Sequence, residues 1–143
     1  MDDTHNSIQH TATPRRKPRI LIVEDDSLIA WDMAVALEDA GCEIIGIVSD
    51  GAAALIQTTT SHPDVVLMDV HIAGDRDGVE TARAFGERGT GPAIIFVTGY
   101  RDPETAERIR KFNPDGYLLK PVMPEELEAA VIRVLEARAA ADE

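Results

Sequence analysis

The chain has 143 residues, of which 26 are acidic and 14 are basic, so its formal net charge is −12. This charge repels phosphate backbones, and we expect no nucleic-acid partner. The single cysteine, Cys42, excludes an internal disulfide and fits a reducing compartment. No apolar run approaches the roughly 20 residues that cross a bilayer. We therefore expect one cytoplasmic domain with no membrane partner.

A polar arm precedes the first strand. Residues 1–17 lack hydrophobic periodicity, which is typical of a disordered segment. The apolar run at residues 19–23 predicts a buried strand, because it is short and continuous. We place the folded domain at residues 18–138 and a flexible tail at residues 139–143. Three acidic residues directly follow the strand: Glu24, Asp25 and Asp26.

The first predicted helix begins after these acids, with Ser27 as its expected cap. Gly41 is a suitable terminator, because glycine readily adopts the left-handed conformation that ends helices. Trp31 lies off the apolar stripe, so it either packs on a flank of the helix or is exposed for a partner; we expect flank packing. The stripe has helical spacing and consists of Ile29, Met33, Ala36, Leu37 and Ala40.

Two further strands and a short helix come next. Residues 43–48 alternate only partly and indicate an edge strand, and the Ala-rich residues 52–59 predict a helix. Val65–Met68 then runs directly into Asp69. Such a run suits a strand buried on both faces in a parallel sheet. Taken alone, Asp69 could equally cap a helix or start a turn.

The second half of the chain repeats this alternation. A loop at residues 70–78 precedes a helix predicted at residues 79–88, and residues 93–97 form a buried strand that ends at Thr98. A strand at residues 117–119 ends at Lys120. The apolar positions expected to contact the core are Val79, Ala82, Ala84 and Phe85 in the third helix, Ala106, Ile109 and Phe112 in the fourth, and Leu127, Ala130, Val131 and Val134 in the last.

Strands and helices alternate five times, so we predict an α/β fold. Right-handed crossovers favour a doubly wound (βα)5 parallel sheet of flavodoxin-like order 2-1-3-4-5. The fourth helix, which begins at Asp102-Pro103, has only three apolar anchors. We expect it to dock weakly and to exchange its amides faster than the central strands.

Chemistry-bearing residues collect at one edge of this sheet. In a parallel sheet the carboxyl ends share one crevice, so the acids after the first strand should meet Asp69. Crowded carboxylates raise a pKa or bind a cation, and a few oxygen ligands with open positions suit Mg²⁺. Thr98 and Lys120 have no role in holding a metal. They do fit a phosphoryl group bonded to Asp69, which they would stabilise by a hydrogen bond and by charge.

These residues closely resemble those of the receiver domain of two-component response regulators, over residues 18–138. The resemblance implies a phosphoprotein of a phosphorelay that accepts a phosphoryl group on Asp69 and catalyses only its own phosphorylation and dephosphorylation. It also implies that Thr98 and Tyr117 act as switch residues and that Lys120 serves the reaction. The implied ligands of Mg²⁺, or of another divalent ion such as Mn²⁺, are Glu24, Asp25, Asp69 and the backbone carbonyl of His71.

Two features resemble a subgroup called FAT GUY receivers, which are often stand-alone proteins of alphaproteobacteria. Residues 96–100 are similar to its signature, with Val97 in place of the motif's alanine. The loop after Asp69 lacks the usual Met-Pro and carries one extra residue before Asp77-Gly78. We expect Tyr100 to overhang the site and slow hydrolysis of the aspartyl phosphate.

The expected partner is a sensor histidine kinase, with the HWE type as one candidate, or a histidine phosphotransfer protein. The protein would be a monomer or weak homodimer that signals by protein contact or serves as a phosphate sink. One alternative is a Mg²⁺-dependent phosphatase or phosphotransferase of the haloacid dehalogenase type, although His71 stands where that class needs an acid. A second is a pseudo-receiver that only binds.

Overall fold

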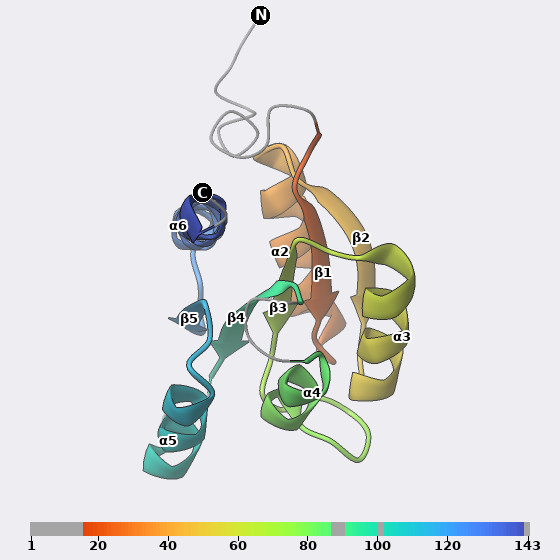
Figure 1. Cartoon of the computed structure of the whole chain (residues 1–143), viewed down its shortest axis with the longest axis vertical. Helices are drawn as coiled ribbons and strands as arrows, with labels where there is room; N and C mark the ends of the chain where they lie inside the picture. Colours follow the sequence, from red (N-terminus) through yellow and green to blue (C-terminus); the bar gives the residue numbers. More distant parts are fainter. Residues whose placement is uncertain (1–15, 87–90, 100–101, 142–143) are drawn as a thin grey trace, which may run out of the picture.

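The computed structural model describes residues 16–86, 91–99 and 102–141. Five parallel strands form a sheet of order β2-β1-β3-β4-β5, and Figure 1 shows them side by side in this order. This confirms the predicted fold. The strands, in chain order, are β1 (Arg19–Val23), β2 (Glu43–Val48), β3 (Val65–Met68), β4 (Ala93–Thr98) and β5 (Gly116–Leu119), and the helices are α2 (Ser27–Asp39), α3 (Gly51–Ser61), α4 (Gly78–Ala84), α5 (Pro103–Phe112) and α6 (Pro124–Ala141).

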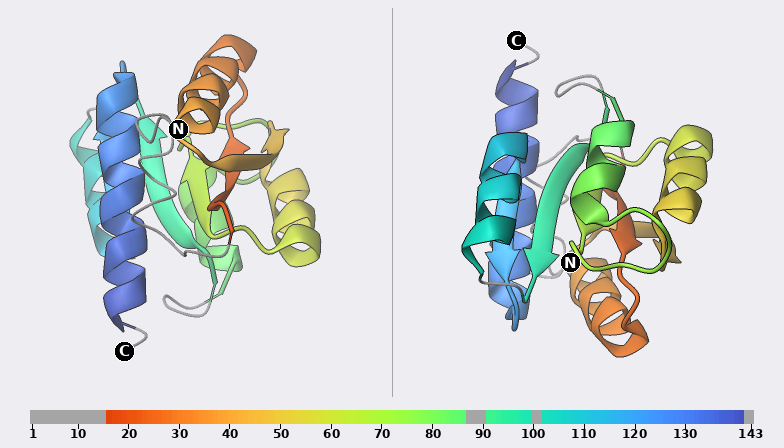
Figure 2. Two further views of the ribbon diagram at one scale, coloured as in Figure 1. Left: turned by 90° about the horizontal axis from the view of Figure 1, so that it is seen from above. Right: turned by 90° about the horizontal axis from the view of Figure 1, so that it is seen from below.

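Alternate residues of the central strands point to opposite faces of the sheet and form two apolar cores. Ile20 and Ile22 of β1 belong to the core shared with α2 and α6, whereas Leu21 and Val23 belong to the core shared with α3, α4 and α5. Every residue of β3 and β4 is buried, as expected for strands that are covered on both faces. Figure 2 shows α6, in blue, running alongside β4 and β5.

The structure corrects the predicted N-cap of α2 and the predicted packing of Trp31. Asp26 rather than Ser27 is the N-cap, because its carboxylate accepts hydrogen bonds from the amides of Leu28 and Ile29. Gly41 ends the helix with a φ of 102°, as predicted. Trp31 does not pack on a flank, since 63% of its surface is exposed. Met33, Leu37 and Ala40 of the predicted stripe are buried, Ile29 and Ala36 are partly buried, and Ala30 and Ala34 are buried in addition.

Helix ends differ from prediction elsewhere too. Helix α3 extends to Ser61, two residues past the predicted end, and the hydroxyls of Thr59 and Thr60 bond to carbonyls one turn earlier. Helix α4 ends at Ala84, four residues short of the predicted end, since Gly86 adopts a φ of 113°. Residues 139–141 belong to α6 rather than to a tail.

Two predicted apolar contacts are wrong. Ala84 and Ala106 are both exposed. The positions that face the core are instead Thr81 of α4 and Thr105 of α5, which are buried beside the correctly predicted Ala82 and Ile109. Helix α5 therefore has fewer apolar anchors than its sequence suggests. Within the described ranges, no helix combines the length and apolar character that crossing a membrane requires.

Candidate phosphoacceptor and cation site

Strand pairing brings the acids of two segments together. Val23 of β1 and Met68 of β3 are partners in register, so Glu24 and Asp69, the next residue of each chain segment, emerge side by side. The amide of Asp69 donates to the carbonyl of Val23 at 3.0 Å, which extends the pairing to the acceptor residue. The position of Asp69 thus follows from the sheet rather than from a loop.

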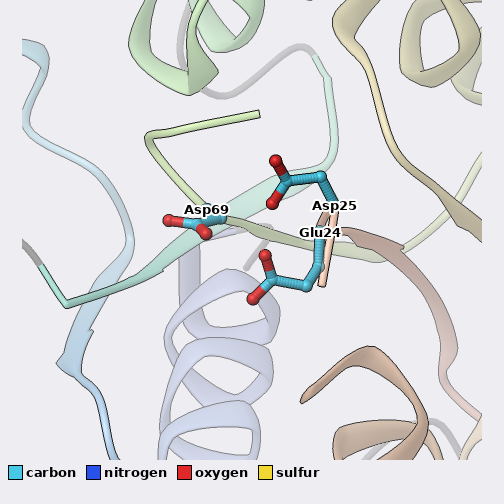
Figure 3. A group of neighbouring side chains, drawn as sticks. All are labelled: Glu24, Asp25 and Asp69. Carbon is cyan, nitrogen blue, oxygen red and sulfur yellow. The ribbon is translucent and has the colours of Figure 1, made fainter. Parts of the chain in front are cut away.

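Three carboxylates converge at this edge. One oxygen each from Glu24, Asp25 and Asp69 lies within 4.8 Å of the others, and Figure 3 shows the three side chains next to one another. Glu24 and Asp69 are buried, whereas Asp25 is exposed and opens the group to solvent. Clustered carboxylate oxygens with an open side match the ligand preference of a hard divalent cation such as Mg²⁺.

Lys120 joins this cluster from the end of β5. Its Nζ donates to Oδ2 of Asp69 at 2.9 Å and also to Oε1 of Glu24. Burial works against the charged ammonium, but the hydrogen bonds to both carboxylates raise the pKa of Lys120 above its ordinary value. Lys120 therefore stays cationic against the carboxylate of Asp69.

Glu24 has an unusual acidity. Burial, together with a hydrogen bond to Asp69, raises the pKa of Glu24 to about 7, while Lys120 opposes the shift. One ammonium faces three carboxylates, so the acids are not fully compensated within the cluster. This charge imbalance favours binding of a further cation.

Thr98 and Tyr117 come from neighbouring strands. Thr98 is fully buried at the end of β4, and its carbonyl accepts a hydrogen bond from the amide of Lys120 at 2.9 Å. Phe96 of β4 pairs in register with Met68 on one side and with Tyr117 on the other. Tyr117 therefore lies on the edge strand, with 40% of its surface exposed.

The remaining predicted site residues are less closely defined. His71 is exposed, and its amide donates to Oδ1 of Asp69 at 3.4 Å. This contact places the residue next to the acceptor, but its carbonyl stays a predicted ligand. Tyr100 lies outside the described residues.

Sequence reasoning did not identify the way the loop after Asp69 is closed. The amide of Gly78 donates to the carbonyl of Val70 at 2.7 Å, so the two ends of the loop meet. A Cβ on Gly78 would lie 2.0 Å from the carbonyl oxygen of Asp69, so only glycine allows this approach. Asp77 caps α4 in a reciprocal capping box with Glu80, a signal that the Asp-x-x-Glu spacing did contain.

Arg108 of α5 binds Asp77 in a fork geometry. Its Nη1 lies 2.7 Å from Oδ2 of Asp77, and its Nη2 donates to Oδ1 at 3.1 Å. The two residues are 31 positions apart. No local pattern in the sequence predicts this pair.

A groove of about 820 Å³ lies between α2 and α6. Trp31, Met33, Val97 and Leu127 contribute to its lining, and it reaches Lys120. The exposed Trp31 thus borders a depression that adjoins the acidic cluster.

Comparison with known proteins identifies a family. The family model described as the response regulator receiver domain matches residues 20–132. The chain is 35% identical over 120 residues to the transcriptional regulatory protein PdtaR of Mycobacterium tuberculosis, covering 84% of this chain and 56% of that protein. It is 30% identical over 115 residues to the DNA-binding response regulator MtrA of Mycobacterium leprae, covering 80% and 50%. The chain spans about half the length of these curated relatives.

Solved structures agree with this match. The signal receiver domain of a modulated diguanylate cyclase from Desulfovibrio desulfuricans superposes with a TM-score of 0.80 at 34% identity, covering 87% of this chain and 98% of that one. A CheY-like response regulator receiver domain protein from Methanospirillum hungatei gives 0.78 at 28% identity, covering 87% and 98%.

Proposed function

Because the chain belongs to the response regulator receiver domain family, we propose that it is a phosphorylation switch in which Asp69 accepts a phosphoryl group. Receiver domains of two-component systems receive this group from histidine kinases or phosphotransfer proteins. The observation that carries the assignment to Asp69 is its contact with Lys120 within the carboxylate cluster. Glu24 also follows a strand and contacts Lys120, so the choice between the two acids rests on the position of Asp69, which resembles that of the family's acceptor.

The chain's own residues suit in-line phosphoryl transfer. An oxygen of Asp69 attacks the phosphorus of a phosphohistidine, a P–O bond forms, and the P–N bond breaks with its electron pair left on the imidazole nitrogen. Lys120 balances negative charge on the phosphoryl oxygens, and the hydroxyl of Thr98 donates a hydrogen bond to one of them. Positioning and charge account for most of the catalysis in such a transfer.

The donor set fits a divalent cation. Glu24, Asp25, Asp69 and the carbonyl of His71 would hold Mg²⁺, or Mn²⁺ in its place, and the ion would supply charge neutralisation at the phosphoryl oxygens. The raised pKa of Glu24 supports this role, because a group that resists ionisation beside two other acids is relieved by a bound cation.

The output is proposed to follow from Thr98 and Tyr117. Movement of Thr98 toward the phosphoryl group, followed by Tyr117, would bias the face formed by α5, α6 and β5 between two states. The signal would pass by protein contact, with no nucleic acid bound by this domain, or the protein would act as a phosphate sink. Its partner is proposed to be a histidine kinase, of the HWE type if the FAT GUY resemblance holds, and the domain a monomer or weak homodimer.

Incubation with acetyl phosphate and Mg²⁺ tests the proposal. We expect an acid- and base-labile acyl phosphate that maps to Asp69 by mass spectrometry, and no adduct on Asp69→Asn. Asp64→Asn is a control, because Asp64 lies at the opposite end of β3. Steady hydrolysis of phosphate monoesters would instead support the haloacid dehalogenase alternative, and absence of any reaction would support the binding module.

A further inference from the structure

The loop that follows Asp69 is held at three points. Its ends meet where the amide of Gly78 binds the carbonyl of Val70, directly against the backbone of Asp69. Its middle is fixed where the amide of Ala73 donates to the carbonyl of Ser49 at 3.0 Å. The third point is Asp77, whose carboxylate binds Arg108 of α5. Loop geometry therefore depends on a residue from a distant helix.

Helix α5 packs on the sheet through a few side chains on either side of Arg108. Its last turn packs through Ile109 and through Phe112, whose ring meets Phe96 edge to face at 5.5 Å. Ala106 is exposed, and Thr105 is the buried residue of the first turn. Between these contacts, the guanidinium of Arg108 joins α5 to the loop by its ion pair with Asp77.

The loop lies close to α5 at a second place. Asp102 caps α5, and hydrogen bonds from Thr105 lower the pKa of its carboxyl, with the imidazole of His71 as a smaller contributor. His71 belongs to the same loop, two residues after the acceptor. The start of the loop thus lies near the first turn of α5.

We propose that Arg108 is a positioning residue for the phosphoacceptor site: by holding Asp77 it sets the loop that abuts Asp69, and it couples the state of Asp69 to α5. This inference rests on the proposed function. A bidentate guanidinium–carboxylate pair is specific in direction and distance, so a shift of the loop by the length of a hydrogen bond breaks it. Coupling of this kind is reciprocal: a change at Asp69 alters α5, and loss of Arg108 alters the affinity of the site.

Beryllofluoride with Mg²⁺, a mimic of a phosphoryl group on a carboxylate, provides the test. Its affinity and its effect on amide exchange in residues 103–112 are measured for wild type, Arg108→Gln, Arg108→Lys and Asp77→Asn. Asn keeps the helix cap while removing the charge. Arg110→Gln is the matched control, because Arg110 is on the same helix and, among the described residues, pairs with Glu107 of that helix.

We expect Arg108→Gln and Asp77→Asn to weaken beryllofluoride binding by about fivefold or more, the lower end of typical coupling. The response of α5 amides to the mimic should disappear in both variants, and the double variant should add nothing. Arg108→Lys should restore part of the response, and Arg110→Gln should match wild type. A merely structural role would lower the free energy of unfolding in urea without changing the affinity of the folded protein.

Wild-type affinity and an unchanged α5 response in Arg108→Gln would overturn the inference, while acetyl phosphate labelling of Asp69 in that variant would leave the proposed function standing. Failure of the wild type itself to bind the mimic and to form the adduct would overturn the proposed function, and the coupling with it.

Discussion

At the scale of single residues, Gly78 is the tightest steric constraint next to Asp69. An added Cβ would lie 2.0 Å from the carbonyl oxygen of Asp69 and 2.9 Å from the Cα of Val70, both backbone atoms that cannot rotate away. The loop would have to open at the hydrogen bond that joins Gly78 to Val70. The demand for glycine here is therefore steric, because its backbone is not in the left-handed region.

We expect Gly78→Ala to lower the free energy of unfolding by about 3 kcal/mol, at the upper end of the cost of overpacking. Urea denaturation followed by circular dichroism measures this loss. Gly99→Ala is the control, since the nearest heavy atom to its added Cβ would be 4.0 Å away. That variant should be neutral or more stable by up to about 1 kcal/mol. Equal stability of the two variants would contradict the steric argument.

At the scale of secondary-structure elements, Asp77 joins α4 to α5 by an interaction that depends on pH. Burial opposes ionisation, but the Arg108 guanidinium and the amide of Glu80 hold the pKa of Asp77 below its ordinary value. A carboxyl with a lowered pKa in the folded state stabilises the fold above its unfolded pKa, near 4. That stabilisation is lost as the pH falls through the folded pKa.

Asp77→Asn should therefore be less stable than wild type by about 1 kcal/mol at pH 7, because the pair is partly solvated and the cap is kept. The difference should stay constant down to about pH 4 and shrink below it. Urea titrations at a series of pH values measure this, with Glu107→Gln as the control for loss of a partly exposed acid on α5. A difference that persisted unchanged below pH 3 would show that the charge on Asp77 is not its source.

Elements were predicted better in their cores than at their ends. The five strands follow from continuous apolar runs, which depend only on burial on both faces. Helix ends depend on single hydrogen bonds and backbone angles, so Asp26 could replace Ser27 as a cap and Gly86 could shorten α4. Trp31 and Ala106 are exposed although packing was predicted for them, because helical periodicity does not show how closely a neighbouring element approaches.

At the scale of the whole molecule, the topology assembles the site. Glu24, Asp69 and Lys120 come from three strands whose carboxyl ends share one edge, so the sheet order was enough to predict that they meet. The Asp77–Arg108 pair does not follow from sheet order. It depends on the path of a loop and on the rotation of α5, and neither leaves a periodic signal in the sequence.

Because the net charge is −12, cations should raise the free energy of unfolding of the whole chain. Salt of any kind should stabilise the chain by screening its self-repulsion. A specific Mg²⁺ site adds RT ln(1 + [L]/Kd), which is about 1.4 kcal/mol when free Mg²⁺ is ten times the dissociation constant. Mg²⁺ should thus raise the free energy of unfolding above that in NaCl of equal ionic strength.

Two neighbouring acids separate these effects. Both acids are exposed. Asp25 belongs to the carboxylate cluster, whereas the carboxylate of Asp26 caps α2. We expect Asp25→Asn to lose the Mg²⁺-specific increment while keeping the NaCl effect, and Asp26→Asn, which preserves the cap, to retain both. Urea denaturation in matched MgCl₂ and NaCl measures all three proteins. An increment that survived in Asp25→Asn would place the cation elsewhere on this acidic surface, because removal of a ligand from a three-carboxylate site must weaken binding.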